Sequence, residues 1–168
     1  MSFFTIILSK MPIENANVKR YYRREIINYN TQEIENMKGL RGLFIRKIII
    51  TAIFLCIPLL FFPASLFELV GIQSPQPLIF ARLLGIAYFA LLIGYWGGIK
   101  ALDNNDNPIH VINMGITSNG LGGMVFLYFG MTGSWSAWSL GAQIYMWLLT
   151  IGAGIITINL FKARKKYM

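Results

Sequence analysis

One long stretch of this chain lacks the charged side chains that a soluble protein places on its surface. From Asn107 to Phe161 there is no Asp, Glu, Lys or Arg, and residues 48–67 and 83–99 are free of them too. Charged residues make up 13% of the chain, whereas a soluble domain has about 25%. A chain of 168 residues cannot bury so much apolar sequence in water, because its surface must stay hydrated. The pattern therefore predicts an integral membrane protein whose first partner is the lipid bilayer.

Four segments have the length of a membrane-spanning helix, which needs about 20 mostly apolar residues. The fold class we expect is all-α: an antiparallel bundle of four transmembrane helices with one short interfacial helix and a basic N-terminal leader. The leader is residues 1–40 and the transmembrane domain is residues 41–168. Within that domain the predicted spans are about 43–62, 78–99, 109–129 and 139–161.

The segments between the spans carry capping signals. Ser65 and Glu68 have the spacing of a capping box, in which a hydroxyl and a carboxylate satisfy free N–H groups of the first helical turn. We expect a short helix at the membrane surface there, ending near Gly71. Asn107 followed by Pro108 suits the N-cap and the first position of the third spanning helix.

The uneven distribution of Lys and Arg predicts the topology. Nine of the 15 basic residues precede or open the first span, Lys100 borders the second loop, and four lie in the C-terminal tail. Four spans put these three regions on one side, so the positive-inside rule places both termini in the cytoplasm. The net charge of +8 then fits contact with an anionic leaflet, and we expect no nucleic-acid partner.

The leader, residues 1–40, allows three interpretations. As a helix it would gather apolar and aromatic side chains on one side and basic ones on the other, as in a helix that lies on the inner leaflet. Its polarity also suits a solvated, partly disordered extension. A third alternative is that translation starts at Met37, so that residues 1–36 are not native. The two faces of the helical alternative are Val18, Tyr21, Tyr22, Ile26 and Tyr29 against Lys19, Arg20, Arg23 and Arg24.

Arg82 is the charged residue that most suggests a ligand or a structural role. It lies about one turn inside the second span, where a charge is costly and usually functional. Its long side chain could instead reach the outer interface. If Arg82 points inward, Glu68 is its natural partner, and a ligand carboxylate or phosphate is the alternative.

Small residues in the second and third spans predict close helix packing, or else a polar pocket. Gly94, Gly97 and Gly98 leave a smooth patch that another helix could approach. In the third span Ser118 and Gly122, like Asn119 and Gly123, are four residues apart, which is typical of tight packing. We expect Asn119 to form hydrogen bonds across the bundle, and the aromatic residues Tyr88, Tyr95 and Trp96 either to pack or to line a cavity.

The sequence shows no self-contained catalytic constellation. There is no nucleophile–base pair, no pair of intramembrane carboxylates and no cysteine cluster, so we predict no catalytic residue, no metal site and no cofactor. Our leading hypothesis is a non-enzymatic accessory or scaffold subunit with a membrane-protein partner. The alternatives are a small homo-oligomeric transporter or channel for a neutral or apolar solute, and a redox subunit that uses a quinone or lipid near Arg82.

A family resemblance extends over roughly residues 40–162. The pattern FFP, LFELVGI and ARLLGIAYFALLIGYWGGIKA, followed by a glycine-rich third span ending VFLYFGMTG, resembles small four-helix membrane proteins of bacteria that are distantly DoxX-like. Some DoxX-like proteins are membrane subunits of quinone-linked oxidoreductases. The resemblance implies the fold and a location in the bacterial inner membrane, and it implies no particular activity. The residues that carry it are Phe62, Pro63, Gly71, Arg82, Gly85, Gly94 and Tyr95.

Overall fold

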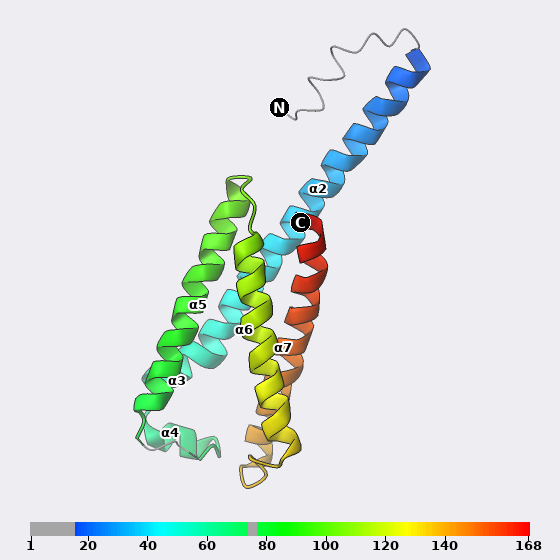
Figure 1. Ribbon diagram of the computed structural model, residues 1–168. Helices are drawn as coiled ribbons and strands as arrows, with labels where there is room; N and C mark the ends of the chain where they lie inside the picture. Colours follow the sequence, from blue (N-terminus) through cyan, green and yellow to red (C-terminus); the bar gives the residue numbers. More distant parts are fainter. Residues whose placement is uncertain (1–15, 74–76) are drawn as a thin grey trace. The chain divides into compact units, whose positions relative to one another are not determined.

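The computed structural model describes residues 16–73 and 77–168 (Figure 1). Over these ranges the chain is helical and has no strand, which confirms the all-α prediction. The elements in chain order are α2 (Ala16–Thr51), the π-helix η1 (Ala52–Cys56), α3 (Ile57–Phe61), α4 (Ala64–Leu69), α5 (Ile79–Asp103), α6 (Ile109–Met131) and α7 (Leu140–Tyr167).

The chain divides into two units, residues 1–40 and residues 41–168. In the first unit the described backbone is helical from Ala16, and the side chains of Arg20, Tyr21, Arg24 and Tyr29 are exposed. The other residues of the two predicted leader faces have side chains outside the described residues: Val18, Lys19, Tyr22, Arg23 and Ile26. The second unit contains every feature discussed below.

Three helices are long and apolar enough to cross a membrane. They cover Ile27–Phe61, Ile79–Asp103 and Leu140–Tyr167. The third predicted span is also a helix, α6, which contains several glycines and the central polar residues Thr117, Ser118 and Asn119; it is not among these three. These helices are what an integral membrane protein requires, because a spanning helix satisfies its own backbone hydrogen bonds in lipid.

The helix starts follow from local capping. α5, α6 and α7 each begin within one residue of a predicted span. The predicted N-cap of α6 is wrong by one residue, because the helix begins at Ile109 and its N-cap is Pro108; Asn107, the residue before, accepts a hydrogen bond from the Ile109 N–H at 3.0 Å. Ser139 accepts from the Ala142 N–H at 3.2 Å at the start of α7. Both side chains satisfy donors that the first helical turn leaves free.

The expected short helix is present as α4, but its predicted cap is wrong. The N-cap is Pro63 and no side chain caps α4, because the helix begins at Ala64 and Ser65 already lies inside its first turn. α4 ends as expected near Gly71, whose φ of 79° favours glycine. A Cβ on Gly71 would also lie 2.1 Å from the Ser139 Oγ, so this turn needs glycine for two reasons.

A proline explains the irregular turn inside the first spanning helix. Pro58 has no backbone N–H, so the carbonyl of Phe54 loses its usual helical donor. The turn before it is a π-helix, in which the Ile57 N–H donates to the Ala52 carbonyl. The Tyr145 hydroxyl of α7 donates a hydrogen bond to the Phe54 carbonyl. The defect in one helix is therefore satisfied by a side chain of another.

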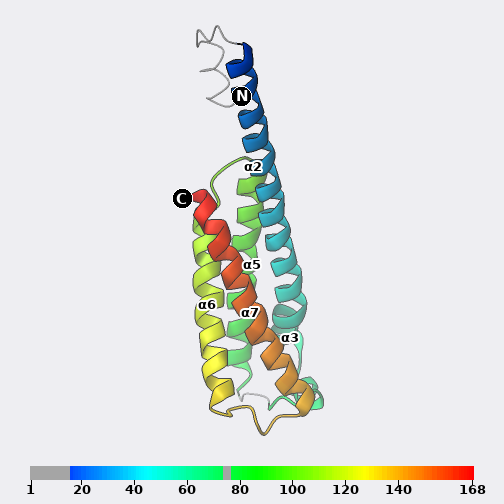
Figure 2. The ribbon, with the colours of Figure 1, turned by 90° about the vertical axis from the view of Figure 1, so that its right-hand side faces the viewer.

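The helices of the second unit pack as two pairs. One pair is η1 and α3 with α5, and the other is α6 with α7, which has the most extensive contact in the unit. Figures 1 and 2 show α6 and α7 side by side in both views, with α5 beside α3. α5 and α6 contact each other much less, so the pairs are joined mainly by side chains.

One buried layer joins the two pairs. It takes one side chain from each long helix: Phe44, Tyr95, Ile112 and Leu160 are almost completely inaccessible. The rings of Phe44 and Tyr95 lie 5.5 Å apart between centroids. Gly115 lets the helices close around this layer, since a Cβ there would lie 2.6 Å from Leu160 and 2.7 Å from the Tyr95 hydroxyl. The layer is the core of the unit and marks one end of the space described next.

Candidate functional site

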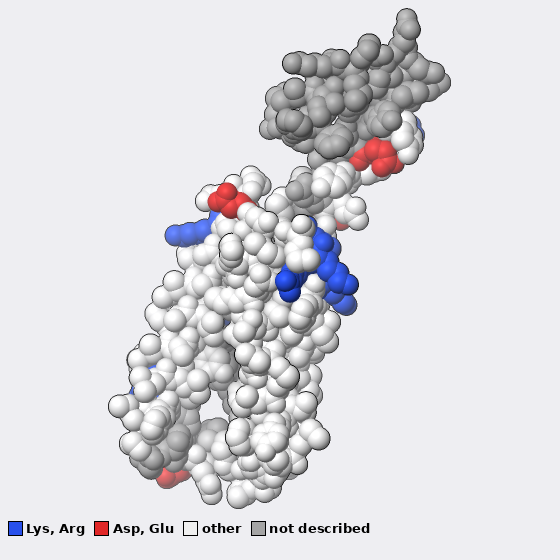
Figure 3. Space-filling view, in the orientation of Figure 1, with Lys and Arg blue, Asp and Glu red and all other residues white. Residues whose placement is uncertain are grey.

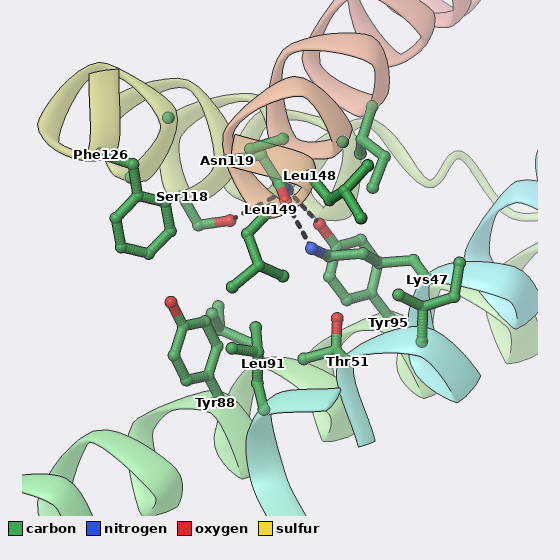
Figure 4. Close-up of a pocket in the computed structure, with 17 residues that line it drawn as sticks. Lys47, Thr51, Tyr88, Leu91, Tyr95, Ser118, Asn119, Phe126, Leu148 and Leu149 are labelled. Carbon is green, nitrogen blue, oxygen red and sulfur yellow. Dashed lines mark hydrogen bonds between the residues drawn. The ribbon is translucent and has the colours of Figure 1, made fainter. Parts of the chain in front are cut away.

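A cavity of about 110 Å³ lies between the two helix pairs, directly beyond the buried layer (Figure 4). The long helices α2, α5, α6 and α7 each contribute to its wall. The polar residues are Lys47, Thr51, Tyr88, Tyr95, Ser118 and Asn119. The remaining described residues that line it are aliphatic, aromatic or glycine. It is thus a mostly apolar space with a few converging polar groups, as ligand sites in proteins usually are.

Asn119 is the centre of the polar end of the cavity. It is 6% exposed, and its Oδ1 accepts a hydrogen bond from the Lys47 Nζ at 2.6 Å. Its Nδ2 donates to the Tyr95 hydroxyl at 2.9 Å and to the Gly115 carbonyl at 2.7 Å. The amide therefore connects α2, α5 and α6, and its own donors are used by the protein.

The groups around Asn119 keep unused hydrogen-bond donors. The Thr51 side chain is 2% exposed, and its hydroxyl has no hydrogen-bond partner. Figure 4 shows this hydroxyl pointing into the cavity. The Lys47 ammonium uses one of its three N–H groups on Asn119. The Tyr95 oxygen accepts from Asn119, which leaves its own proton free to be donated.

The other end of the cavity is apolar apart from one hydroxyl. Leu91, Phe126, Leu148 and Leu149 form its walls. Figure 4 shows Tyr88 at this end, a long way from the Lys47 and Asn119 group. Since Tyr88 and Tyr95 come from the same helix two turns apart, the cavity runs along α5 away from the buried layer.

Arg82 lies outside this cavity and binds the end of another helix. Its Nη1 donates to the Leu59 carbonyl at 2.7 Å and its Nη2 to the Phe62 carbonyl at 2.6 Å. These carbonyls belong to the last turn of α3, which has no N–H groups to pair with them and carries the negative end of the helix dipole. The guanidinium thus acts as a C-cap.

The expected pairing of Arg82 with Glu68 is not found. Among the described residues the ion pair is Arg41 with Asp103, at 2.9 Å, and Glu68 is exposed. The reason is geometric: α3 ends beside Arg82, and two backbone carbonyls match its fork of donors, while Glu68 lies on α4 with an exposed side chain.

The small residues predicted for packing fall into two groups. Gly94, Gly98 and Gly123 are close to neighbours: a Cβ on them would lie 2.8 Å from Met114, 2.8 Å from Val111 and 3.4 Å from Ala153, respectively. Gly97 and Gly122 have nothing within 4 Å. Gly122 is open because it lines the cavity, together with Ser118 and Asn119.

A second hollow, of about 590 Å³, lies on another face of the α6 and α7 pair. Its described walls are apolar or small, with Thr117, Asn119, Thr150 and Thr157 as the polar residues. The hydroxyls of Thr150 and Thr157 donate to carbonyls of their own helix, those of Met146 and Ala153. This hollow therefore offers no unsatisfied polar group comparable to Thr51.

Sequence reasoning missed Lys47 and Thr51. Lys47 was interpreted only as part of the positive charge at the start of the first span. The signal that could have found it is its position, four residues inside the predicted span 43–62, with Thr51 one turn further on. Arg82 likewise lies about one turn inside a predicted span. Of the predicted aromatic residues, Tyr88 and Tyr95 line the cavity, whereas Trp96 is 55% exposed.

Comparison with known proteins adds no neighbour to this description. Within the described residues, no group of three or more His, Cys, Asp or Glu could hold a metal ion. The resemblance to DoxX-like proteins stays an expectation from the sequence. No family model matches the chain, and no curated protein and no solved structure matches it.

Proposed function

We propose that this chain is a multi-pass integral membrane protein that binds a small molecule in the cavity between its helix pairs. The observation that carries the proposal is the Thr51 hydroxyl, which is 2% exposed, unpartnered and directed into that cavity. Leaving a buried hydroxyl without a partner costs about 1–3 kcal/mol. A ligand or ordered water that supplies the missing partner removes this cost.

We infer four membrane spans, with α6 as the fourth. α6 has 23 residues, so at about 1.5 Å per residue it is about 34 Å long, enough for a hydrocarbon core of about 30 Å. It packs along α7, which is itself long and apolar enough to span. Its glycines and central polar residues explain why it is not among the three helices whose length and composition alone indicate a membrane span.

The distribution of Lys and Arg supports an orientation of the bundle in the membrane. Figure 3 shows Lys and Arg gathered at the end of the unit where α5 and α7 finish, with a nearly uncharged band beyond it. Lys100 is in the last turn of α5, and Arg164, Lys165 and Lys166 are in the last turn of α7. By the positive-inside rule this end is cytoplasmic, and the resemblance suggests the bacterial inner membrane.

The proposal moves the ligand site away from Arg82. The sequence offers a quinone or lipid near Arg82 as one alternative, but Arg82 is not among the residues that line the cavity, and its Nη1 and Nη2 donate to the carbonyls of Leu59 and Phe62. The free donors that line the cavity are those of Lys47, Thr51 and Tyr95. The role we propose is that of a non-enzymatic binding component, either alone or as the subunit of a membrane complex.

The direct test is to identify what the purified protein carries. The full chain would be extracted in mild detergent and its small-molecule content determined by mass spectrometry. In the variant Gly122→Leu the new side chain fills the cavity, because a Cβ at Gly122 has nothing within 4 Å. The matched control is Gly97→Leu, which also has open space but lies outside the cavity.

The proposal expects a molecule that is retained by the wild type and Gly97→Leu and lost from Gly122→Leu. If all three proteins carry the same small molecules in the same amounts, the cavity is not the binding site and the proposal is wrong.

Transport is the second candidate function, favoured by the two-pair packing. The helices contact each other extensively within each pair and little between pairs. Movement of one pair against the other around a central site is a common mechanism of alternating access. Uptake of the identified molecule into liposomes by the wild type, without uptake by Gly122→Leu, would support transport; binding without uptake would exclude it.

A further inference from the structure

We infer that the ligand of this cavity is a monoanionic carboxylate with an alkyl chain, its carboxylate bound by Lys47, Thr51 and Tyr95. The inference rests on the proposed function, since it names the chemistry of that same site. It follows from three observations: the balance of donors and acceptors, the balance of charge, and the size and polarity of the cavity.

The polar end of the cavity has donors to spare and few acceptors. Lys47 has two unused N–H groups, Tyr95 one unused O–H, and Thr51 a hydroxyl without any partner. The Asn119 carbonyl oxygen already accepts from Lys47, and the two N–H groups of its amide donate to the Tyr95 hydroxyl and the Gly115 carbonyl. A complementary ligand must therefore bring acceptors. An ionised carboxylate is acceptor-only and has room for several donors.

The charge of the site gives the charge of the ligand. Lys47 is the one charged side chain among the described residues that line the cavity, and no Asp or Glu is among them. Its described partner is a neutral amide. A protonated lysine in this apolar setting is costly unless an anion pairs with it. One positive charge is balanced by one negative charge, which favours a carboxylate over a phosphate dianion.

The size of the cavity fits a carboxylate and the first carbons of a chain. A cavity of about 150 Å³ holds the six carbons of benzene, so about 110 Å³ holds roughly four or five non-hydrogen atoms, which is the carboxylate and the first carbons of butyrate. The polar end is closed by the buried layer, so the carboxylate lies at Lys47 and the chain points toward Phe126 and Leu148. A longer chain would have to continue beyond these residues.

Two sources share this chemistry: short-chain carboxylates from solution, and fatty acids from the membrane. The experiment uses radiolabelled butyrate and decanoate, with butanol and decanol as neutral analogues. Binding to the full chain in mild detergent is measured by equilibrium dialysis. Micelles of the same detergent without protein serve as the blank for partition of each compound into micelles. Binding of butyrate points to the soluble source, and binding of decanoate alone points to the membrane.

The variants test the individual contacts. Lys47→Met is expected to weaken carboxylate binding about tenfold or more, because it removes the charged partner. Thr51→Val keeps the shape and removes the hydroxyl, so we expect a loss of roughly threefold to tenfold. Thr150→Val is the matched control: its hydroxyl is satisfied within α7 and does not line this cavity, so it should bind like the wild type.

The outcomes separate this inference from the proposed function. If the alcohols bind as tightly as the acids and Lys47→Met retains both, the cavity is a ligand site but the carboxylate assignment is wrong. If the acids bind but Thr51→Val loses no more than Thr150→Val, Thr51 is not a contact and the assignment also fails. If no acid or alcohol binds and Gly122→Leu carries the same molecules as the wild type, the proposed function itself is overturned.

Discussion

Two basic side chains enter the apolar part of this bundle, and they are used in opposite ways. Arg82 gives two nitrogens to two backbone carbonyls, those of Leu59 and Phe62, at 2.7 and 2.6 Å. Lys47 gives one N–H to a side-chain amide, Asn119, and the rest of its ammonium faces a cavity.

The difference shows how a structural cation can be told from a binding cation. The partners of Arg82 are helix-end carbonyls that are present whenever the fold is present, so these two hydrogen bonds, made by two of its five N–H groups, stabilise the fold. Lys47 instead lines a cavity with unused N–H groups, next to the unpartnered Thr51 hydroxyl. A cation in a membrane helix is thus informative only once its acceptors are counted.

The largest effect should come from Arg82→Met. It leaves the carbonyls at the end of α3 without donors, and we expect a loss of about 2–4 kcal/mol of unfolding free energy, seen as a lower thermal midpoint in detergent. Arg82→Lys should lie between, because lysine lacks the planar fork that reaches both carbonyls. If Arg82→Met keeps its thermal midpoint and loses only the bound molecule, Arg82 is a binding cation and its assignment as a structural cation is wrong.

Gly115→Ala should have the next largest effect. Its Cβ would lie 2.6 Å from Leu160 and 2.7 Å from the Tyr95 hydroxyl, so the buried layer must move apart, at a cost of about 1–3 kcal/mol. Gly122→Ala is the control on the same helix, because a Cβ there has open space. If Gly115→Ala and Gly122→Ala have the same thermal midpoint, the layer is loosely packed.

Tyr145→Phe should destabilise by about 1–2 kcal/mol, because the Phe54 carbonyl loses its donor. Combining it with Pro58→Ala tests the cause. Alanine restores a backbone N–H, which can serve that carbonyl, so the penalty of Tyr145→Phe should be smaller in the Pro58→Ala background. If the double-mutant cycle gives the same penalty for Tyr145→Phe in both backgrounds, the Tyr145 hydrogen bond does not compensate for the missing N–H of Pro58.

The smallest effect on stability should come from Lys47→Met. The substitution removes the cost of a buried ammonium but leaves the Asn119 oxygen without its donor; these effects oppose each other, so the unliganded protein should change by less than about 1 kcal/mol. The same substitution at Arg82 is the matched comparison. A drop in midpoint as large as that of Arg82→Met would show that Lys47 is a structural cation too.

The sequence predicted the helices well because their signals are local. Apolar length locates α5 and α7, and Asn107 and Ser139 mark helix starts by their own capping chemistry. The Ser65 cap was wrong because Pro63 moved the start of α4 by a residue or two. Local signals give the elements and leave their boundaries uncertain by about that much.

Only part of the site could be predicted from the sequence, because the site depends on which faces of the four long helices contact each other. Asn119 stood out as a polar residue in an apolar helix. Whether it would meet Tyr95, Lys47 or lipid depends on the rotation of four helices about their axes, which no single segment contains. Arg82 shows the same limit: the sequence offered Glu68 as its partner, and backbone carbonyls that carry no sequence signal took its place.

Tyr95 belongs to two structures at once. Its ring is part of the four-residue layer that blocks the bundle on the side where α7 ends, and its hydroxyl lies at the closed end of the cavity. A ligand that accepts a hydrogen bond from this hydroxyl fixes the side chain that seals the interior. Ligand binding in the cavity and the packing of the buried layer are therefore linked through the ring of Tyr95. The cavity stays closed at this end for as long as that ring keeps its position.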